Sequence, residues 1–287
     1  MNTTVPITPA SPSWHLPVIE FGHSADGLLV ARVGDTAFAM VPTRQGRHFL
    51  ATGWRLTRPL DTWKRGDFYG HSGDVADEAA FRALVAESAK HQRERVALGR
   101  REIASRANTP WGPSQGATIY GEGVLCHSTA GHGGFQLAPE QNARVHPLLR
   151  SSSGFYEEDA EWAAVAQALP DLFTGYERRL ADETLRNHWP EAWEAIHGRA
   201  LQPGESRERD RQTFERHHAG DRIVIAAVNS DRFPGFVETT ATLGGQRGPG
   251  IERRCFLVPS VEYEPGLFGF VIDPARHCAP DEKDPGD

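Results

Sequence analysis

Residues 109–137 read TPWGPSQGATIYGEGVLCHSTAGHGGFQL, a stretch in which glycine and proline repeatedly interrupt short apolar runs. Two of these runs, at residues 117–120 and 123–129, have the length and composition of β-strands. Downstream, residues 159–169 carry apolar side chains at helical spacing, which indicates a helix. Strands followed by a run of helices, rather than a regular alternation of the two, are typical of the α+β class.

The C-terminal third of the chain is predicted to be a sheet. Four strands are expected, at residues 222–228, 237–243, 253–258 and 267–272, with glycine and proline in the turns between them. This spacing predicts an antiparallel meander. We expect the helical segment 159–198 to pack against this C-terminal sheet, with Trp162 and Trp193 mostly buried, because neither element can bury its apolar face alone. Within the segment, Thr174 and Glu177 have the spacing of a capping box.

The first third of the chain is predicted to be rich in strands. Three are expected, at residues 28–33, 36–41 and 48–54. Gly34 and Asp35 separate the first two and suit a two-residue hairpin turn. A long helix should follow, with Asp74 as its N-cap and its end near Arg106. The second half of this helix, residues 91–106, is largely polar and is interpreted as a solvated arm.

These patterns divide the chain into four expected parts. They are a disordered leader at residues 1–13, a small β-rich region at 14–107 that ends in the long helix, an α+β domain at 108–278, and an acidic tail at 279–287.

Composition narrows the classes of function. The net charge of −7 argues against general nucleic-acid binding, which depends on phosphate neutralisation by Lys and Arg, although a local basic patch stays open. No apolar run approaches the roughly 20 residues that span a bilayer, and the N-terminus lacks the basic and apolar regions of a signal peptide. The three cysteines form no CxxC pattern, which favours free thiols in a cytoplasmic protein.

His132 is the most unusual candidate for chemistry, because it lies among Gly131, Gly133 and Gly134. Such a loop exposes consecutive N–H groups that suit an anion, or it holds an imidazole clear of its neighbours as a general base. The alternative is a tight turn between two strands. Three glycines exceed what a turn needs, so the excess suggests close approach by a ligand or by another stretch of backbone.

The acids of Tyr156-Glu-Glu-Asp159 are the candidate partners of His132. At the start of a helix they complement its dipole, but a carboxylate could also orient the imidazole in a catalytic couple. The predicted catalytic residues are therefore His132, Glu157, Glu158 and Asp159. The predicted ligand-binding residues are Gly131, Gly133, Gly134, Ser128, Thr129 and Trp111.

Cys126 and His127 do not form a nucleophile–base pair if they share a strand, since adjacent side chains then point to opposite faces. A metal site would need to collect Cys126, His127, His132 and the pair His277 and Cys278. Their spacing fits no zinc motif, so no metal site is predicted and the cofactor stays unknown.

Several motifs resemble an uncharacterised domain family found in proteins of plasmids, integrative elements and phages. They are TPWG at 109–112, the ST–HGG core at 128–134, FYEED at 155–159 with Trp162, and CFLVP at 255–259. The resemblance covers about residues 108–278. In that family the two positions before the Ser-Thr are apolar, whereas here they are Cys126 and His127. The resemblance implies a role in establishing mobile DNA or in evading host defence, but no biochemical activity.

The sequence therefore leads to one expected function and two alternatives. The first is an uncharacterised cytoplasmic accessory protein of mobile genetic elements. The second is a hydrolase or transferase that uses a His–carboxylate couple. The third is a non-catalytic interaction module that uses residues 91–106 and 205–219. Partners stay open between a protein and a small ligand, with no membrane involvement and no nucleic acid indicated by the charge.

Overall fold

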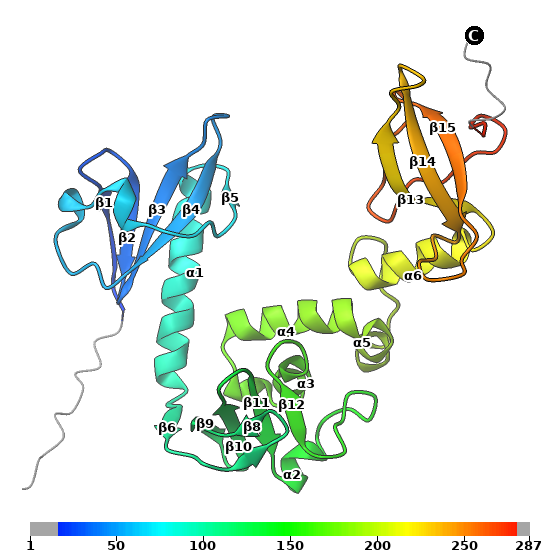
Figure 1. Cartoon of the computed structure of the whole chain (residues 1–287). Helices are drawn as coiled ribbons and strands as arrows, with labels where there is room; N and C mark the ends of the chain where they lie inside the picture. The colour runs from blue at the N-terminus through cyan, green and yellow to red at the C-terminus, as the bar shows by residue number, and fades with distance from the viewer. Residues whose placement is uncertain (1–16, 280–287) are drawn as a thin grey trace, which may run out of the picture. The chain divides into compact units, whose positions relative to one another are not determined.

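The computed structural model describes residues 17–279, so the expected leader and nearly all of the expected acidic tail lie outside the described residues. The chain packs as two compact units, Met1–Asp182 and Glu183–Asp287. Helices and antiparallel sheets occur in both units, which confirms the α+β class (Figure 1).

An antiparallel meander opens the first unit. Its strands, in spatial order, are β1 (Ile19–His23), β2 (Leu29–Val33), β3 (Thr36–Pro42), β4 (His48–Trp54) and β5 (Asp74–Val75). The predicted hairpin at Gly34 is confirmed, and Gly34 has φ of 56°, a conformation that glycine adopts without strain. Phe81 and Val85 of the following helix pack on one face of the sheet. Trp63, fully buried near the short 3₁₀ helices η1 (Leu60–Thr62) and η2 (Arg65–Asp67), packs on the other.

Helix α1 (Glu78–Ala97) differs from its prediction at both ends. Its N-cap is Asp77, whose side chain accepts a hydrogen bond from the backbone of Ala80 at 2.7 Å, whereas Asp74 lies in β5. The helix ends before Arg106 because Gly99 adopts φ of 60°, as a helix-terminating glycine does. The prediction overlooked this glycine.

A second antiparallel sheet follows α1. Its spatial order is β12 (Phe155–Glu157), β11 (Gly133–Leu137), β10 (Val124–Ser128), β9 (Gly116–Gly121) and β6 (Arg101–Ile103); β7 (Asn108–Thr109) and β8 (Gly112–Pro113) pair separately. Strands β9 and β10 confirm the predicted pair. Strands β11 and β12 were not predicted, and the expectation that Tyr156 to Asp159 begins a helix was wrong. Tyr156 instead pairs with Phe135 of β11 and is almost fully buried.

The helices after this sheet are α2 (Pro139–Asn142), α3 (Trp162–Ala168), the 3₁₀ helix η3 (Pro170–Leu172), α4 (Gly175–His188), α5 (Pro190–His197) and α6 (Arg207–His217). Helix α3 packs against β11 and β12 of the second sheet. Trp193 is buried as expected, whereas Trp162 is half-buried with its ring 6.3 Å from that of Phe173.

The predicted C-terminal sheet is present as the antiparallel meander β13 (Arg222–Asn229), β14 (Phe236–Leu243) and β15 (Arg254–Pro259). The expected fourth strand at 267–272 forms isolated bridges instead, between Val271 and Ile223 and between Gly269 and Gly266. The helical segment beside this part of the chain is α6, whose Phe214 contacts Phe268 at 5.8 Å between ring centroids.

The start of α4 is joined to the end of α1 by buried polar contacts. The predicted capping box is confirmed: Thr174 N donates to Glu177 Oε2 at 2.8 Å, and Glu177 N donates to Thr174 Oγ1 at 3.1 Å. Arg100 donates two hydrogen bonds to the same carboxylate, from Nη1 at 2.8 Å and from Nη2 at 2.6 Å. Its guanidinium carbon also lies 3.9 Å from the centroid of the Tyr120 ring. Arg100 therefore joins the polar arm to α4, while most of the other residues at 95–106 are exposed.

Candidate functional site

The loop that carries His132 is a tight turn between β10 and β11. The backbone N–H of Thr129 donates to the carbonyl of His132 at 2.9 Å, and the Thr129 hydroxyl donates to the same oxygen at 2.5 Å. Thr129 therefore shapes the turn. The His132 imidazole projects outward, with 62% of its side chain exposed.

The glycines beside His132 are explained mainly by close packing. A Cβ at Gly134 would lie 2.2 Å from the carbonyl oxygen of Tyr156 and 2.4 Å from the Trp111 ring. A Cβ at Gly133 would lie 2.6 Å from Glu158 Oε2. A Cβ at Gly131 would meet nothing within 4 Å. Close approach by another stretch of backbone therefore accounts for Gly134. It also accounts for Gly133, where a Cβ would lie 2.6 Å from the His127 carbonyl oxygen as well as from the Glu158 carboxylate.

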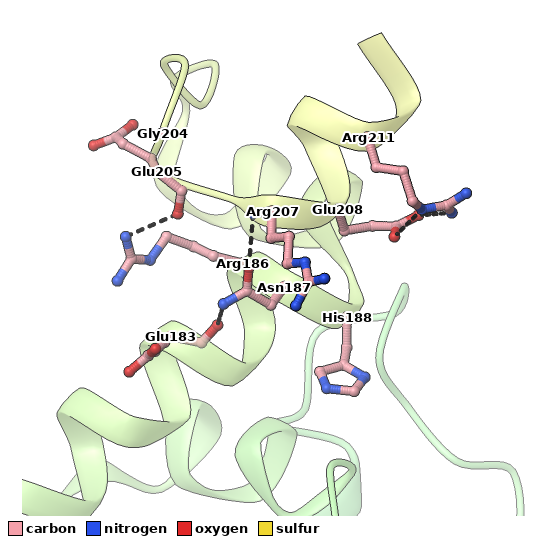
Figure 2. Close-up of a pocket in the computed structure, with 9 residues that line it drawn as sticks. All are labelled: Glu183, Arg186, Asn187, His188, Gly204, Glu205, Arg207, Glu208 and Arg211. Carbon is pink, nitrogen blue, oxygen red and sulfur yellow. Dashed lines mark hydrogen bonds and ion pairs between the residues drawn. The ribbon is translucent and has the colours of Figure 1, made fainter. Parts of the chain in front are cut away.

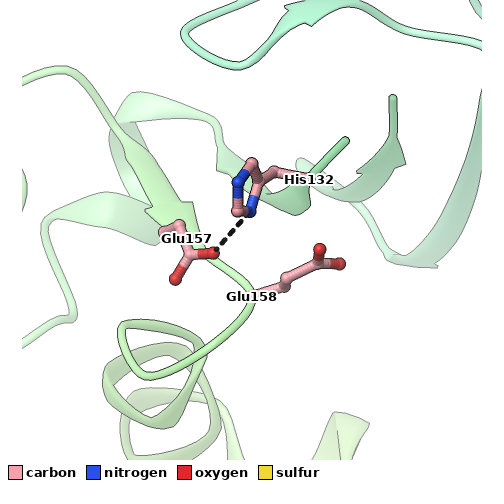
Figure 3. Close-up of side chains that lie close together, drawn as sticks. All are labelled: His132, Glu157 and Glu158. Carbon is pink, nitrogen blue, oxygen red and sulfur yellow. Dashed lines mark ion pairs between the residues drawn. The ribbon is translucent and has the colours of Figure 1, made fainter. Parts of the chain in front are cut away.

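Strand β12 brings two of the predicted acids to His132. Glu157 pairs with Gly134, and the backbone N–H of Glu158 donates to the Gly133 carbonyl at 3.1 Å. Glu157 Oε1 lies 3.7 Å from His132 Nδ1, as the dashed line in Figure 3 shows. Donor atoms of His132, Glu157 and Glu158 all lie within 4.8 Å of one another. The structure thus assembles a His–Glu–Glu cluster from segments 25 residues apart.

The remaining predicted residues have other places. Asp159 contributes its backbone N–H, which donates to Glu157 Oε2 at 2.7 Å, and its carboxylate is not part of the cluster. Trp111 is half-buried and contacts Phe155 edge to face at 5.9 Å, so it supports the turn from below. Ser128 is exposed and lines a neighbouring cavity.

This cavity, of about 670 Å³, lies over strands β6, β9 and β10 beside the cluster. Glu158, Cys126, His127 and Ser128 are among the residues that line it, so Glu158 belongs to both the cluster and the cavity. Burial, reinforced by the nearby charge of Glu158, raises the pKa of the Cys126 thiol to about 11. Cys126 is therefore protonated at neutral pH, which opposes a role as a nucleophile.

The sequence interpretation missed a buried polar chain behind this cavity. His127 is 2% exposed, with Nδ1 3.1 Å from Ser114 Oγ and Nε2 2.9 Å from Gln136 Oε1. Ser114 in turn donates to the carbonyl of Gly116 at 2.9 Å. Gln136 lies on the neighbouring strand β11, so only correct prediction of that strand could have indicated the contact. Both ring nitrogens of the buried His127 therefore have a hydrogen-bond partner, Ser114 on one side and Gln136 on the other.

A second cavity of about 670 Å³ lies in the other unit, between the end of α4 and the start of α6 (Figure 2). Polar side chains that line this cavity form hydrogen bonds between the end of α4 and the segment at the start of α6. Arg186 Nη1 donates to the carbonyl of Glu205 at 3.0 Å, and the backbone N–H of Arg207 donates to Asn187 Oδ1 at 2.9 Å. Ser206 caps α6 by accepting from Arg209 N. This cavity therefore lies where α4 and α6 are joined, and the ion pair of Arg211 and Glu208 lies on its wall.

Comparisons with known proteins identify one region. Residues 104–219 match DUF7007, a domain of unknown function. An uncharacterised domain is thus present over residues 108–219 of the predicted region, whereas the C-terminal meander and its CFLVP motif lie outside the match. Neither a curated protein nor a solved structure matches the chain significantly. Among residues 17–279, no helix is long and apolar enough to cross a membrane.

Proposed function

We propose that this chain is an intracellular accessory protein of mobile genetic elements, which acts on a ligand or partner through the His–Glu–Glu cluster and the cavity beside it. One observation supports this location of the site. Glu158 belongs both to the cluster and to the lining of the cavity, so a group bound at the cluster faces an open cavity of about 670 Å³. The motif resemblance to plasmid and phage proteins supports the cellular role.

The test is genetic. Deletion of the gene from its element should lower the frequency of establishment in a new host by at least about 10-fold, and the wild-type gene should restore it. His132→Ala and Glu158→Gln should fail to restore it. His217→Ala on α6 and Glu122→Gln in the β9–β10 turn, both exposed, serve as matched controls and should restore it. Normal establishment without the gene, in hosts with and without restriction systems, would rule the proposal out.

A second candidate is an enzyme of the hydrolase or transferase class with His132 as the general base. The ion-pair distance of 3.7 Å between His132 Nδ1 and Glu157 Oε1 favours it, since a carboxylate can orient an imidazole in this way. Purified protein should then turn over a member of a panel of ester, amide and phosphodiester substrates. Turnover that survives both His132→Ala and Glu157→Gln would exclude this mechanism.

The third alternative, a non-catalytic interaction module, has no comparable support. It relied on residues 91–106 and 205–219, and polar side chains of both segments are engaged within the fold. Arg100 holds Glu177, and Arg209 pairs with Glu191 and Glu194.

A further inference from the structure

The His–Glu–Glu cluster has the donor set and spacing of a metal site. It offers the imidazole nitrogen of His132 and one carboxylate oxygen each from Glu157 and Glu158, all within 4.8 Å of one another. Ligands about 2.1 Å from a tetrahedral ion lie roughly 3.4 Å apart. The 3.7 Å between His132 Nδ1 and Glu157 Oε1 is close to this value.

The fold orients the Glu157 side chain and positions the backbone of Glu158. Glu157 Oε2 accepts from the backbone N–H of Asp159 at 2.7 Å, which orients its other oxygen toward His132. Glu158 is anchored through its backbone to Gly133, where a Cβ would lie 2.6 Å from both the Glu158 carboxylate and the carbonyl oxygen of His127. Supporting contacts of this kind orient ligands in metal sites.

One oxygen in the cluster lacks a partner. Glu157 Oε1 is shielded from solvent and accepts no hydrogen bond from any described residue. A carboxylate oxygen in that state carries an uncompensated desolvation cost. The His132 imidazole lies 3.7 Å from this oxygen, which is too far for a hydrogen bond. A bound cation would supply the missing partner.

We propose that His132, Glu157 and Glu158 bind one divalent transition-metal ion, with Mn²⁺ or Zn²⁺ as the favoured class. The imidazole ligand favours these ions over Mg²⁺ and Ca²⁺, which prefer oxygen alone. Three protein ligands leave at least one coordination position open, as in catalytic rather than structural sites. Glu158 lines the adjoining cavity, so the open position faces the space that a ligand would enter.

This inference deepens the proposed function by naming what the same site holds, and it revises the expectation of no metal. That expectation considered the cysteines, His127 and His277 as companions of His132 and did not consider Glu157 and Glu158 as ligands. The acids that do reach it are 25 and 26 residues away in the sequence, on a strand that was not predicted.

The test is calorimetric titration of the full-length protein, first freed of metal, with Mn²⁺ and Zn²⁺. One ion should bind per chain, and Mg²⁺ should bind at least about 10-fold more weakly. His132→Ala, Glu157→Gln and Glu158→Gln should each weaken binding by at least about 10-fold. Glu122→Gln and His217→Ala should leave it unchanged, and circular dichroism should show that every variant is folded.

A measurement on the unmodified protein covers the case in which a variant does not fold. Bound Mn²⁺ should broaden the NMR signals of residues 131–134 and 156–159 before those of other residues. Absence of saturable binding, or binding that survives all three substitutions, would overturn the proposal and assign any uptake to other histidines. Metal binding and establishment are measured separately. If the site binds no metal but is needed for establishment, only this inference is refuted. If the site binds metal but is not needed for establishment, only the proposed function is refuted.

Discussion

At the scale of single residues, glycines determine where the site can form. Gly133 and Gly134 occupy positions where a side chain would collide with Glu158 and with β12, whereas Gly131 faces open space. The three glycines look alike in the sequence. The structure shows that Gly133 and Gly134 lie against close neighbours, whereas Gly131 has no neighbour within 4 Å. The distinction can be measured directly.

Gly134→Ala should destabilise the protein by about 2–3 kcal/mol, because the new methyl group would overlap Tyr156 O and the Trp111 ring. Gly131→Ala, the matched control, should change the free energy of unfolding by no more than about 0.5 kcal/mol. Urea denaturation of both variants compares the two values. Equal effects would mean that the turn does not pack against β12 as described.

At the scale of elements, the predictable features were those encoded locally. The hairpin at Gly34 and the capping box of Thr174 and Glu177 each need only a few adjacent residues, and both are confirmed. Strands β11 and β12 were missed because the first begins with Gly133 and Gly134 and the second ends in acids. Their pairing depends on each other and on β10 rather than on local propensity.

The same reasoning explains how much of the site was predictable. Chemistry suggested that His132 and a nearby carboxylate belong together, and the structure places Glu157 and Glu158 beside it. Asp159 was predicted with them but contributes only its backbone, since strand geometry rather than helical geometry positions these acids. The role of His127 was invisible without its partners Ser114 and Gln136, which come from other segments.

The joint between α1 and α4 gives an element-scale prediction. The side chains of Arg100 and Glu177 are only 9% and 18% exposed. Arg100→Ala should therefore destabilise the protein by on the order of 3 kcal/mol, since it leaves a largely buried carboxylate unpaired. Arg47→Ala removes an exposed partner of Asp74 and should cost at most about 1 kcal/mol. Thermal denaturation of the two variants tests the contrast.

The same joint should make stability depend on acid. Burial alone would raise the pKa of Glu177, but hydrogen bonds from Arg100 and from Thr174 N outweigh it and hold the pKa below its ordinary value of 4.5. A lowered pKa in the folded state adds stability that is present above pH 4.5 and lost as the pH falls through the folded value. Glu177→Gln should remove this part of the acid-dependent loss. An unchanged pH profile of the melting temperature would contradict the assignment.

At the scale of the whole molecule, the three cysteines differ in how exposed their thiols are and should therefore differ in reactivity. All are free: Cys255 is exposed, Cys278 is half-buried, and Cys126 has its pKa raised to about 11. Thiol titration under denaturing, non-reducing conditions should count three. In the native protein at pH 8, Cys255 should react first and Cys126 much more slowly, because the thiolate is the reactive form. A denatured count of one would reveal a disulfide.

Helix α4 has a further consequence for how the chain can be divided. The boundary between the compact units falls after Asp182, inside α4, whereas the DUF7007 match runs from residue 104 to residue 219 and contains the whole helix. The matched block therefore coincides with neither compact unit. Its two boundaries leave α4 uncut, with the capping box at its start and the Arg186 contact at its end. The block also keeps His132, Glu157 and Glu158 together, whereas strand β6 and Arg100 lie outside it.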